Sequence, residues 1–139
     1  MEFNIKLHNS LSELDSLSEK LRELGETWHL PDKIIHQINL VLDELFTNTV
    51  TYGYSDDLDH IISISFDYDT DQIFIKMVDD GHNFDPTEQE EPDMSLTPEE
   101  RELGGLGIFL VHKYIDEITH AYKDGNNIIH MVKKLHKKC

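Results

Sequence analysis

Positions 40–53 read Leu40-Val41-Leu42-Asp43-Glu44-Leu45-Phe46-Thr47-Asn48-Thr49-Val50-Thr51-Tyr52-Gly53, a stretch that joins an apolar helical face to polar side chains. It closes a helical pattern that begins near Pro31. Apolar side chains return at helical spacing along that pattern and predict one buried face: Ile34, Ile35, Ile38, Leu42, Leu45 and Phe46. We therefore expect one long helix over residues 31–53 whose apolar side belongs to the core.

Glu44 and Asn48 are the polar pair of this stretch. Because they are four residues apart, they lie one helical turn above each other and point the same way. A carboxylate above an amide can present a metal ion or a water molecule. The pair can also be two solvated residues on an outer face, which is the common arrangement of polar residues on a helix.

Two later stretches carry a carboxylate and glycines beside predicted elements. The strand-like run Ile73–Val78 leads straight into Asp79-Asp80-Gly81-His82-Asn83-Phe84-Asp85-Pro86, and Gly104-Gly105-Leu106-Gly107 opens a second apolar helix. A glycine at position 81 would let a planar ring approach the backbone, and glycine amides at a helix N-terminus favour phosphate. An ordinary acidic turn and a plain glycine turn are the alternatives.

In this order, Glu44-x-x-x-Asn48, Asp79-x-Gly81-x-x-Phe84 and Gly104-Gly105-x-Gly107 resemble the N, G1 and G2 boxes of the GHKL (HATPase_c) ATP-binding superfamily. The chain is most similar to its short branch, the anti-sigma factor serine kinases, over nearly its whole length. The resemblance implies an α+β fold, a two-layer sandwich whose mixed, mostly antiparallel sheet has helices on one face. It also implies a single domain over residues 1–139 with an ATP lid at about residues 85–104.

The resemblance implies ATP and Mg²⁺ as cofactors and gives the motif residues their roles. Asn48 would hold Mg²⁺ at the phosphates, and Glu44 would be the general base toward the attacking hydroxyl. Asp79 would accept a hydrogen bond from the adenine amino group. Arg101 is the candidate for a phosphate or transition-state contact, with a solvated lid residue as the alternative. The other residues expected around the nucleotide are Gly81, Phe84, Gly104, Gly105, Leu106 and Gly107.

The function that the resemblance implies is that of an ATP- and Mg²⁺-dependent anti-sigma regulatory factor with protein serine/threonine kinase activity. Such a protein sequesters a sigma factor, phosphorylates an anti-sigma-factor antagonist on serine, and forms a homodimer. The alternative is a nucleotide-gated protein-binding module with little or no kinase activity. A third possibility is a degenerate domain that no longer binds nucleotide.

Composition limits the other classes of function. The chain has 139 residues, and its 28 acidic against 12 basic side chains give a formal charge of −16, so we expect no direct binding to nucleic acid. It contains no apolar run that could span a bilayer and no signal-peptide layout, so we expect no membrane insertion and a cytoplasmic location. The nine histidines are scattered, and Cys139 is the only cysteine, so neither a structural zinc site nor an intrachain disulfide is expected.

Local patterns predict the remaining elements. Residues 3–7 alternate as a half-buried strand, and a capping box of Ser10 and Glu13 opens an amphipathic helix that we expect to end at Gly25. Arg22 on this helix is a weaker candidate for contact with a partner. Residues 62–68 and 73–78 form a predicted hairpin.

The end of the chain predicts a helix after the glycines and then a closing hairpin. Its strands are expected at residues 118–122 and 128–135, joined by the turn Asp124-Gly125-Asn126-Asn127. Four lysines near the C-terminus are interpreted as a solvated end, with contact to an acidic partner as the alternative: Lys133, Lys134, Lys137 and Lys138.

Overall fold

The computed structural model describes residues 2–85 and 105–135, with residues 105–108 described by their backbone alone. Arg101, Gly104 and the expected ATP lid therefore lie outside the described residues. The elements in chain order are β1 (Glu2–His8), a short 3-10 turn (Leu11–Glu13), α1 (Leu14–Trp28), α2 (Asp32–Tyr52), β2 (Ile61–Tyr68), β3 (Gln72–Asp79), α3 (Gly105–Tyr114), β4 (Glu117–Lys123) and β5 (Asn126–Lys134).

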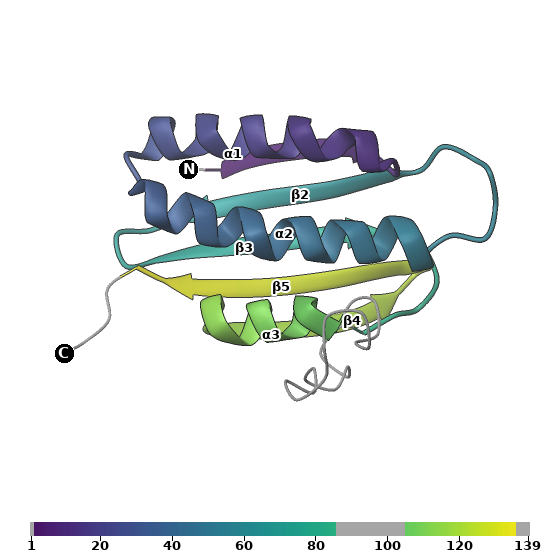
Figure 1. Ribbon diagram of the computed structural model, residues 1–139. Helices are drawn as coiled ribbons and strands as arrows, with labels where there is room; N and C mark the ends of the chain where they lie inside the picture. The colour runs from purple at the N-terminus through teal and green to yellow at the C-terminus, as the bar shows by residue number, and fades with distance from the viewer. Residues whose placement is uncertain (1, 86–104, 136–139) are drawn as a thin grey trace.

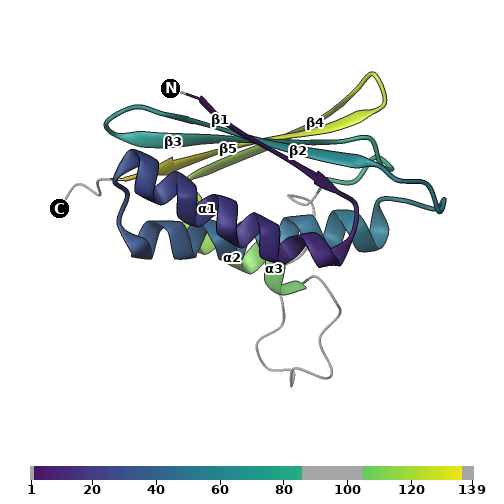
Figure 2. The ribbon, with the colours of Figure 1, turned by 90° about the horizontal axis from the view of Figure 1, so that it is seen from above.

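The strands form one five-stranded sheet in the order β1-β2-β3-β5-β4. All the pairings among the described strands are antiparallel, so none of them supplies the parallel pair that a mixed sheet would contain. Figure 1 shows the three helices in front of the sheet, running roughly along its strands, and Figure 2 shows that they share one of its faces. The predicted two-layer α+β sandwich is confirmed.

The core lies between the helices and the inner face of the sheet. Alternate residues of the strands and the apolar stripes of α1 and α2 meet there, as the sequence periodicities predict. Side chains at most 1% exposed include Leu17, Leu21, Leu24, Ile38, Leu42, Phe46, Ile62, Ile64, Phe66, Ile73, Ile75 and Met77. Burying one such side chain stabilises the fold by about 1.5–3 kcal/mol relative to leaving it in water. None of the helices in the described part of the chain is long and apolar enough to cross a membrane.

The predicted end of the first helix at Gly25 is wrong, because α1 continues to Trp28. The chain leaves the helix at His29, which is in the left-handed conformation with φ of 54°. The Leu30 amide then donates to the Gly25 carbonyl at 2.9 Å. Gly25 serves the packing of α1 on α2 instead, since a Cβ at this position would lie 2.7 Å from Cγ1 of Ile35.

The predicted capping box at Ser10 and Glu13 has a different bonding pattern. The Ser10 hydroxyl accepts from the Ser12 amide at 3.3 Å, and the Glu13 carboxylate accepts from the His8 amide at 2.9 Å. Both side chains therefore cap backbone donors where the chain passes from β1 into the helical layer, but they do not form the expected reciprocal pair.

The prediction of a solvated lysine cluster is wrong for Lys133. This side chain is only 5% exposed, and its Nζ donates to the carbonyl of Tyr114 at 2.7 Å. Tyr114 is the last residue of α3, and a cation is favourable at the C-terminal end of a helix. Lys134 is exposed as expected, whereas Lys137 and Lys138 lie outside the described residues.

Candidate functional site

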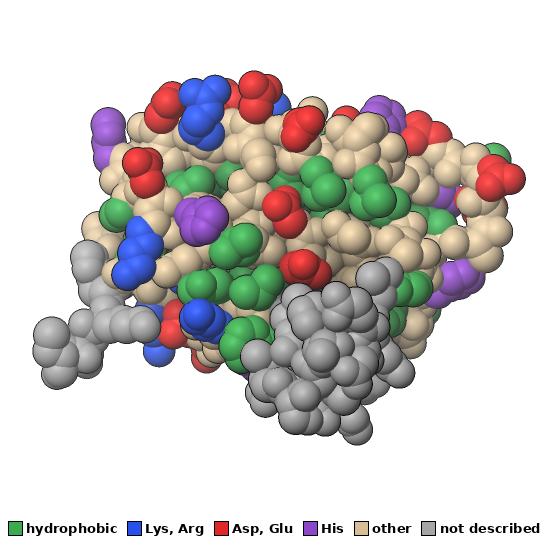
Figure 3. Space-filling model, viewed as in Figure 1, with side chains coloured by type: hydrophobic (Ala, Val, Ile, Leu, Met, Phe, Trp, Pro, Cys, Tyr) green, Lys and Arg blue, Asp and Glu red, His purple; other side chains and the backbone are tan. Residues whose placement is uncertain are grey.

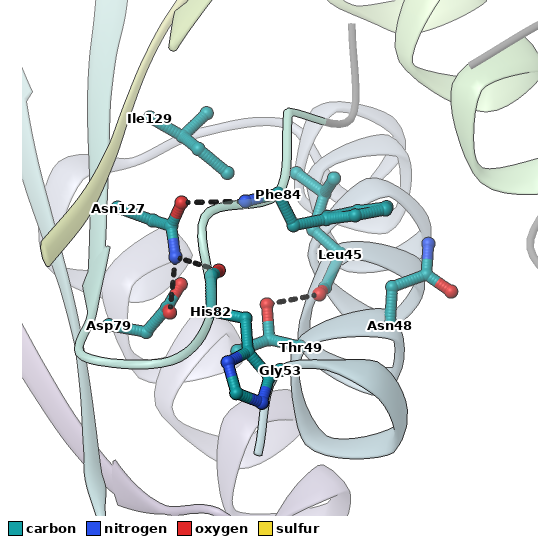
Figure 4. A pocket seen from close by; sticks show the side chains of 9 residues that line it. All are labelled: Leu45, Asn48, Thr49, Gly53, Asp79, His82, Phe84, Asn127 and Ile129. Atoms are coloured by element: carbon teal, nitrogen blue, oxygen red, sulfur yellow. Dashed lines mark hydrogen bonds between the residues drawn. The ribbon is translucent and has the colours of Figure 1, made fainter. Parts of the chain in front are cut away.

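A small cavity lies between the C-terminal half of α2, the end of β3 and the start of β5. The residues around it come from these three elements and from the loop after β3: Leu45, Asn48, Thr49, Gly53, Asp79, His82, Phe84, Asn127 and Ile129 (Figure 4). The space that it encloses is only about 10 Å³, roughly what one water molecule needs. The fold thus brings two of the predicted motifs, about thirty residues apart in the chain, to one cavity.

Two polar residues of helix α2, Asn48 and Thr49, line this cavity. Asn48 is 5% exposed, so the alternative that it is a solvated residue on an outer face is wrong. No described residue makes a hydrogen bond to the Asn48 amide. Thr49 beside it satisfies its hydroxyl within the helix, since its Oγ1 donates to the Leu45 carbonyl at 3.0 Å. Glu44, one turn before Asn48, is only partly buried.

Strand β3 ends in the buried carboxylate of Asp79, which is 4% exposed. Its Oδ1 accepts from the Gly81 amide at 2.9 Å and from Nδ2 of Asn127 at 3.0 Å. Its other oxygen, Oδ2, accepts no hydrogen bond from the described residues. Burial raises the pKa of Asp79, while the hydrogen bonds from Asn127 and Gly81 lower it and the charge of Asp80 raises it further.

Gly81 allows the loop after β3 to reach the end of α2. A Cβ at Gly81 would lie 2.6 Å from the carbonyl oxygen of Gly53 and 3.1 Å from Oδ1 of Asp79. The next amide, of His82, donates to that same Gly53 carbonyl at 2.7 Å. The missing side chain is thus needed for a close approach of two backbone segments, a reason that the sequence motif alone did not suggest.

Asn127 is the site residue that the sequence interpretation missed, because it was assigned to the turn before the last strand. The turn consists of Asp124 and Gly125, both with positive φ, and Asn127 already belongs to β5. The available signal was the alternation of β5, because Asn127 stands two residues before Ile129 in the row of inward-facing residues.

The third predicted motif lies at the start of α3, which begins at Gly105. Leu106 and Gly107 belong to its first turn, but their side-chain surroundings are not described, so their predicted roles stay predictions. Among the described residues, no group of three or more His, Cys, Asp or Glu side chains could hold a metal ion.

A second polar cluster lies next to the cavity. The ring nitrogens of His60 face Oδ1 of Asp56 at 2.7 Å and both carboxylate oxygens of Asp80 at 3.1 Å. The ring also stacks on Tyr54, with 4.4 Å between the centroids. This cluster joins the loop after α2 to the residue that follows Asp79.

Comparison with known proteins assigns the family. A family model described as histidine kinase-like ATPase domain matches residues 7–133, which is most of the chain. The chain belongs to the histidine kinase-like ATPase domain family. The matched region of this ATPase domain contains all the described elements that form the cavity.

Curated relatives of this ATPase domain carry kinase and anti-sigma names. The serine-protein kinase RsbW of Listeria monocytogenes is 26% identical over 108 residues, covering 75% of this chain and 68% of the relative. The anti-sigma F factor of Clostridium beijerinckii is 24% identical over 100 residues, covering 72% of this chain and 70% of the relative. The resemblance to the anti-sigma factor serine kinase branch of the GHKL superfamily is confirmed.

A solved structure shares the fold of this ATPase domain. It contains the RsbU and RsbW domains of a Mycobacterium tuberculosis protein and superposes with a TM-score of 0.67 and 14% sequence identity. The match covers 99% of this chain but only 33% of that larger protein. At this identity the likeness concerns the fold, and it agrees with the α+β sandwich in Figure 1.

Proposed function

We propose that the cavity is the base-binding part of an ATP site, and that the protein is an ATP-dependent regulatory serine kinase of the anti-sigma type. The observation that carries this proposal is the buried Asp79 carboxylate, which has one oxygen fixed by two donors and the other without a described donor. Asp79 lines the cavity, and an acceptor there that lacks a described donor favours a ligand that brings one, such as the amino group of adenine. The names of the relatives support the same function.

The other motif residues would act around the phosphates. Asn48 fits a Mg²⁺ ligand, because it lines the cavity, its amide accepts no hydrogen bond from the described residues, and it offers the oxygen type that this ion prefers. Mg²⁺, when bound, would neutralise phosphate charge. Glu44 would hold the proton of the attacking serine hydroxyl. Arg101, Gly104, Gly105, Leu106 and Gly107 keep their predicted roles at the phosphates.

The small size of the cavity gives base binding a conformational requirement. A space of about 10 Å³ does not hold a purine, so side chains must shift before the base enters. Phe84 is the candidate, since it is only partly buried and extends from the loop toward α2 (Figure 4). This requirement also favours the second candidate function, a nucleotide-gated binding module, in which base entry changes a protein-binding surface.

Calorimetric titration of the full chain with ATP, with and without Mg²⁺, tests the nucleotide site. We expect Asp79→Asn to abolish ATP binding and Asn48→Ala to remove its Mg²⁺ dependence. Asp57→Asn and Asn4→Ala, both at exposed positions, are the matched controls and should bind as the unaltered chain does. Absence of ATP binding to the unaltered chain would contradict the proposal.

A transfer assay separates the kinase from the binding module, because both bind ATP. Transfer of the γ-phosphate to a serine of a candidate antagonist protein is expected, and Glu44→Gln should slow it about 10²- to 10⁴-fold, the usual contribution of a general base. Binding of ATP without any transfer would favour the module. The sigma factor and antagonist as partners, the homodimer and the cytoplasmic location are part of this proposal.

A further inference from the structure

The Asn127 amide joins three segments of the chain at the cavity. Its Nδ2 donates to Oδ1 of Asp79 at 3.0 Å and to the His82 carbonyl at 2.7 Å. Its Oδ1 accepts from the Phe84 amide at 3.1 Å and lies 2.8 Å from Nε2 of His120. Asn127 itself is 2% exposed, and its bond to Asp79 is buried, whereas the bonds to His82, Phe84 and His120 are partly buried.

These partners leave the Asn127 amide only one orientation. A flipped amide would place its oxygen against the Asp79 carboxylate and the His82 carbonyl, and its NH₂ against the Phe84 amide. Each mismatch would leave a donor or an acceptor without a partner, which disfavours the flipped orientation. The bond to Oδ1 also requires that His120 carries a proton on Nε2.

We propose that Asn127 is the positioning residue that makes this site select adenine over guanine. The inference rests on the proposed function, because it deepens the role of Asp79 in ATP binding. Asn127 and the Gly81 amide together occupy Oδ1, so Oδ2 is the acceptor left for the ligand. Adenine carries an amino donor where guanine carries a carbonyl oxygen, and a carboxylate held in place attracts the first and repels the second.

Asn127 also opposes protonation of this acceptor. Asp79 is buried beside Asp80, and both influences favour the protonated carboxyl, which the Asn127 bond opposes. Among the described residues, His120 favours the charged form of this carboxyl, and Tyr54 is a further titratable group that interacts with it. Without Asn127, Asp79 would lose both its orientation and part of its charge, and with them its preference for adenine.

Titration of Asn127→Ala with ATP and GTP tests the inference directly. We expect the affinity for ATP to fall about 10- to 100-fold, the usual loss for a hydrogen bond to a charged group, and the affinity for GTP to change less than about threefold. Asn126→Ala is the matched control, because the same substitution one residue earlier lies off the inward-facing row of β5. It should leave both affinities unchanged.

The outcomes separate this inference from the proposed function. If the unaltered chain prefers ATP and Asn127→Ala keeps that preference, Asn127 has no positioning role and the inference alone is wrong. An equal loss for ATP and GTP would likewise overturn it. If the unaltered chain binds no ATP, the proposed function is wrong and the inference fails with it.

Asn127→Asp provides a second, nearly isosteric test that also decides the matter should the alanine variant fail to fold. The new carboxyl can donate to Asp79 only when it is protonated. ATP should therefore bind this variant about tenfold more tightly at pH 5.5 than at pH 8, while the unaltered chain shows no such gain toward acid. Parallel pH profiles for the two proteins would overturn the inference.

Discussion

His60 is the residue with the clearest electrostatic role outside the cavity. Its hydrogen bond to Asp56 raises its pKa, and the hydrogen bond to Asp80 adds to this effect. The protonated ring donates from both nitrogens and so satisfies both carboxylates, whereas the neutral ring has one donor. His60 thus connects the loop after α2 to the end of β3 through its charge.

Replacing His60 should therefore destabilise the fold in a pH-dependent manner. Since the pKa is raised in the folded state, the stabilisation is fully present below the ordinary pKa of about 6.5 and is lost as pH rises through the folded value. We expect His60→Gln to lower the free energy of unfolding more at pH 6 than at pH 8.5, measured by urea unfolding. His8→Gln, whose ring pairs with Asp59 at an exposed position, is the control and should show a smaller difference. A pH-independent effect of His60→Gln would contradict the role of the protonated ring in joining Asp56 and Asp80.

Asp43, directly before Glu44, also makes stability fall as pH rises, but through burial of its own carboxylate charge. Burial raises its pKa to about 6, the charge of Glu44 adds to this, and a hydrogen bond from Asn39 opposes it. The proton is held more tightly in the folded than in the unfolded chain, so stability is lost as pH rises from about 4 through 6.

Asp43→Asn should remove this loss, because an amide oxygen can still accept from Asn39 without being charged. We expect the variant to match the unaltered chain at pH 4 and to exceed its free energy of unfolding by up to about 2 kcal/mol at pH 7.5. Urea unfolding at both pH values measures the difference, with Asp57→Asn in an exposed loop as the control. A variant less stable than the unaltered chain at pH 7.5 would show that the Asp43 charge is favourable.

Helix α1 packs closely against α2 at Gly25, which has no side chain. Alanine at this position favours the helical conformation by about 1 kcal/mol, but its Cβ would lie 2.7 Å from Cγ1 and 3.3 Å from Cδ1 of Ile35. Ile35 is branched at Cβ and has few rotamers with which to avoid the clash. The overpacking should dominate.

We expect Gly25→Ala to destabilise the fold by about 1–3 kcal/mol, the usual range for overpacked sites. Adding Ile35→Ala should restore part of this loss, since the truncated side chain no longer meets the new methyl group. A double-mutant cycle by urea unfolding measures the coupling between the two positions. Additive effects of the two substitutions would show that the clash is relieved elsewhere.

The sequence predicted those elements whose periodicity is unbroken. The apolar row of residues 34–46 predicted α2, and the alternation of residues 62–68 and 73–78 predicted the hairpin of β2 and β3. The predicted end of α1 at Gly25 was wrong, because a glycine after an apolar stripe can mark a helix end but can also permit close packing of two helices. The prediction for Lys133 was wrong because the carbonyl that makes burial favourable belongs to Tyr114, nineteen residues earlier.

The candidate site was predictable where a motif carries its own chemistry. Asp79 and Asn48 were expected from motif spacing, and the structure places both at one cavity. Asn127 was not expected, because Asp, Gly and Asn in succession are typical of a turn and most of its partners lie more than forty residues earlier in the chain. Its role becomes visible only when β5 pairs with β3 and sets Asn127 opposite Asp79.

The molecule as a whole carries a large negative charge. The formal charge is −16, and Figure 3 shows acidic side chains spread over the helical face. Folding brings these charges closer together than they are in the unfolded chain, and their repulsion opposes the compact state. The charge also disfavours a polyanionic partner, so the surface suits basic or neutral protein partners.

Salt should therefore stabilise this protein, because it screens repulsion that acts over more than one Debye length, about 30 Å at 10 mM and 10 Å at 100 mM. Between 10 and 200 mM NaCl at pH 8 we expect the thermal midpoint to rise by about 4 °C, which corresponds to about 1 kcal/mol in a chain of this size. The double variant Glu19→Gln/Glu117→Gln, at two exposed positions, removes two negative charges. Its thermal midpoint should depend less on salt. A midpoint that falls with salt would mean that attractive pairs, such as those of His60, outweigh the overall repulsion.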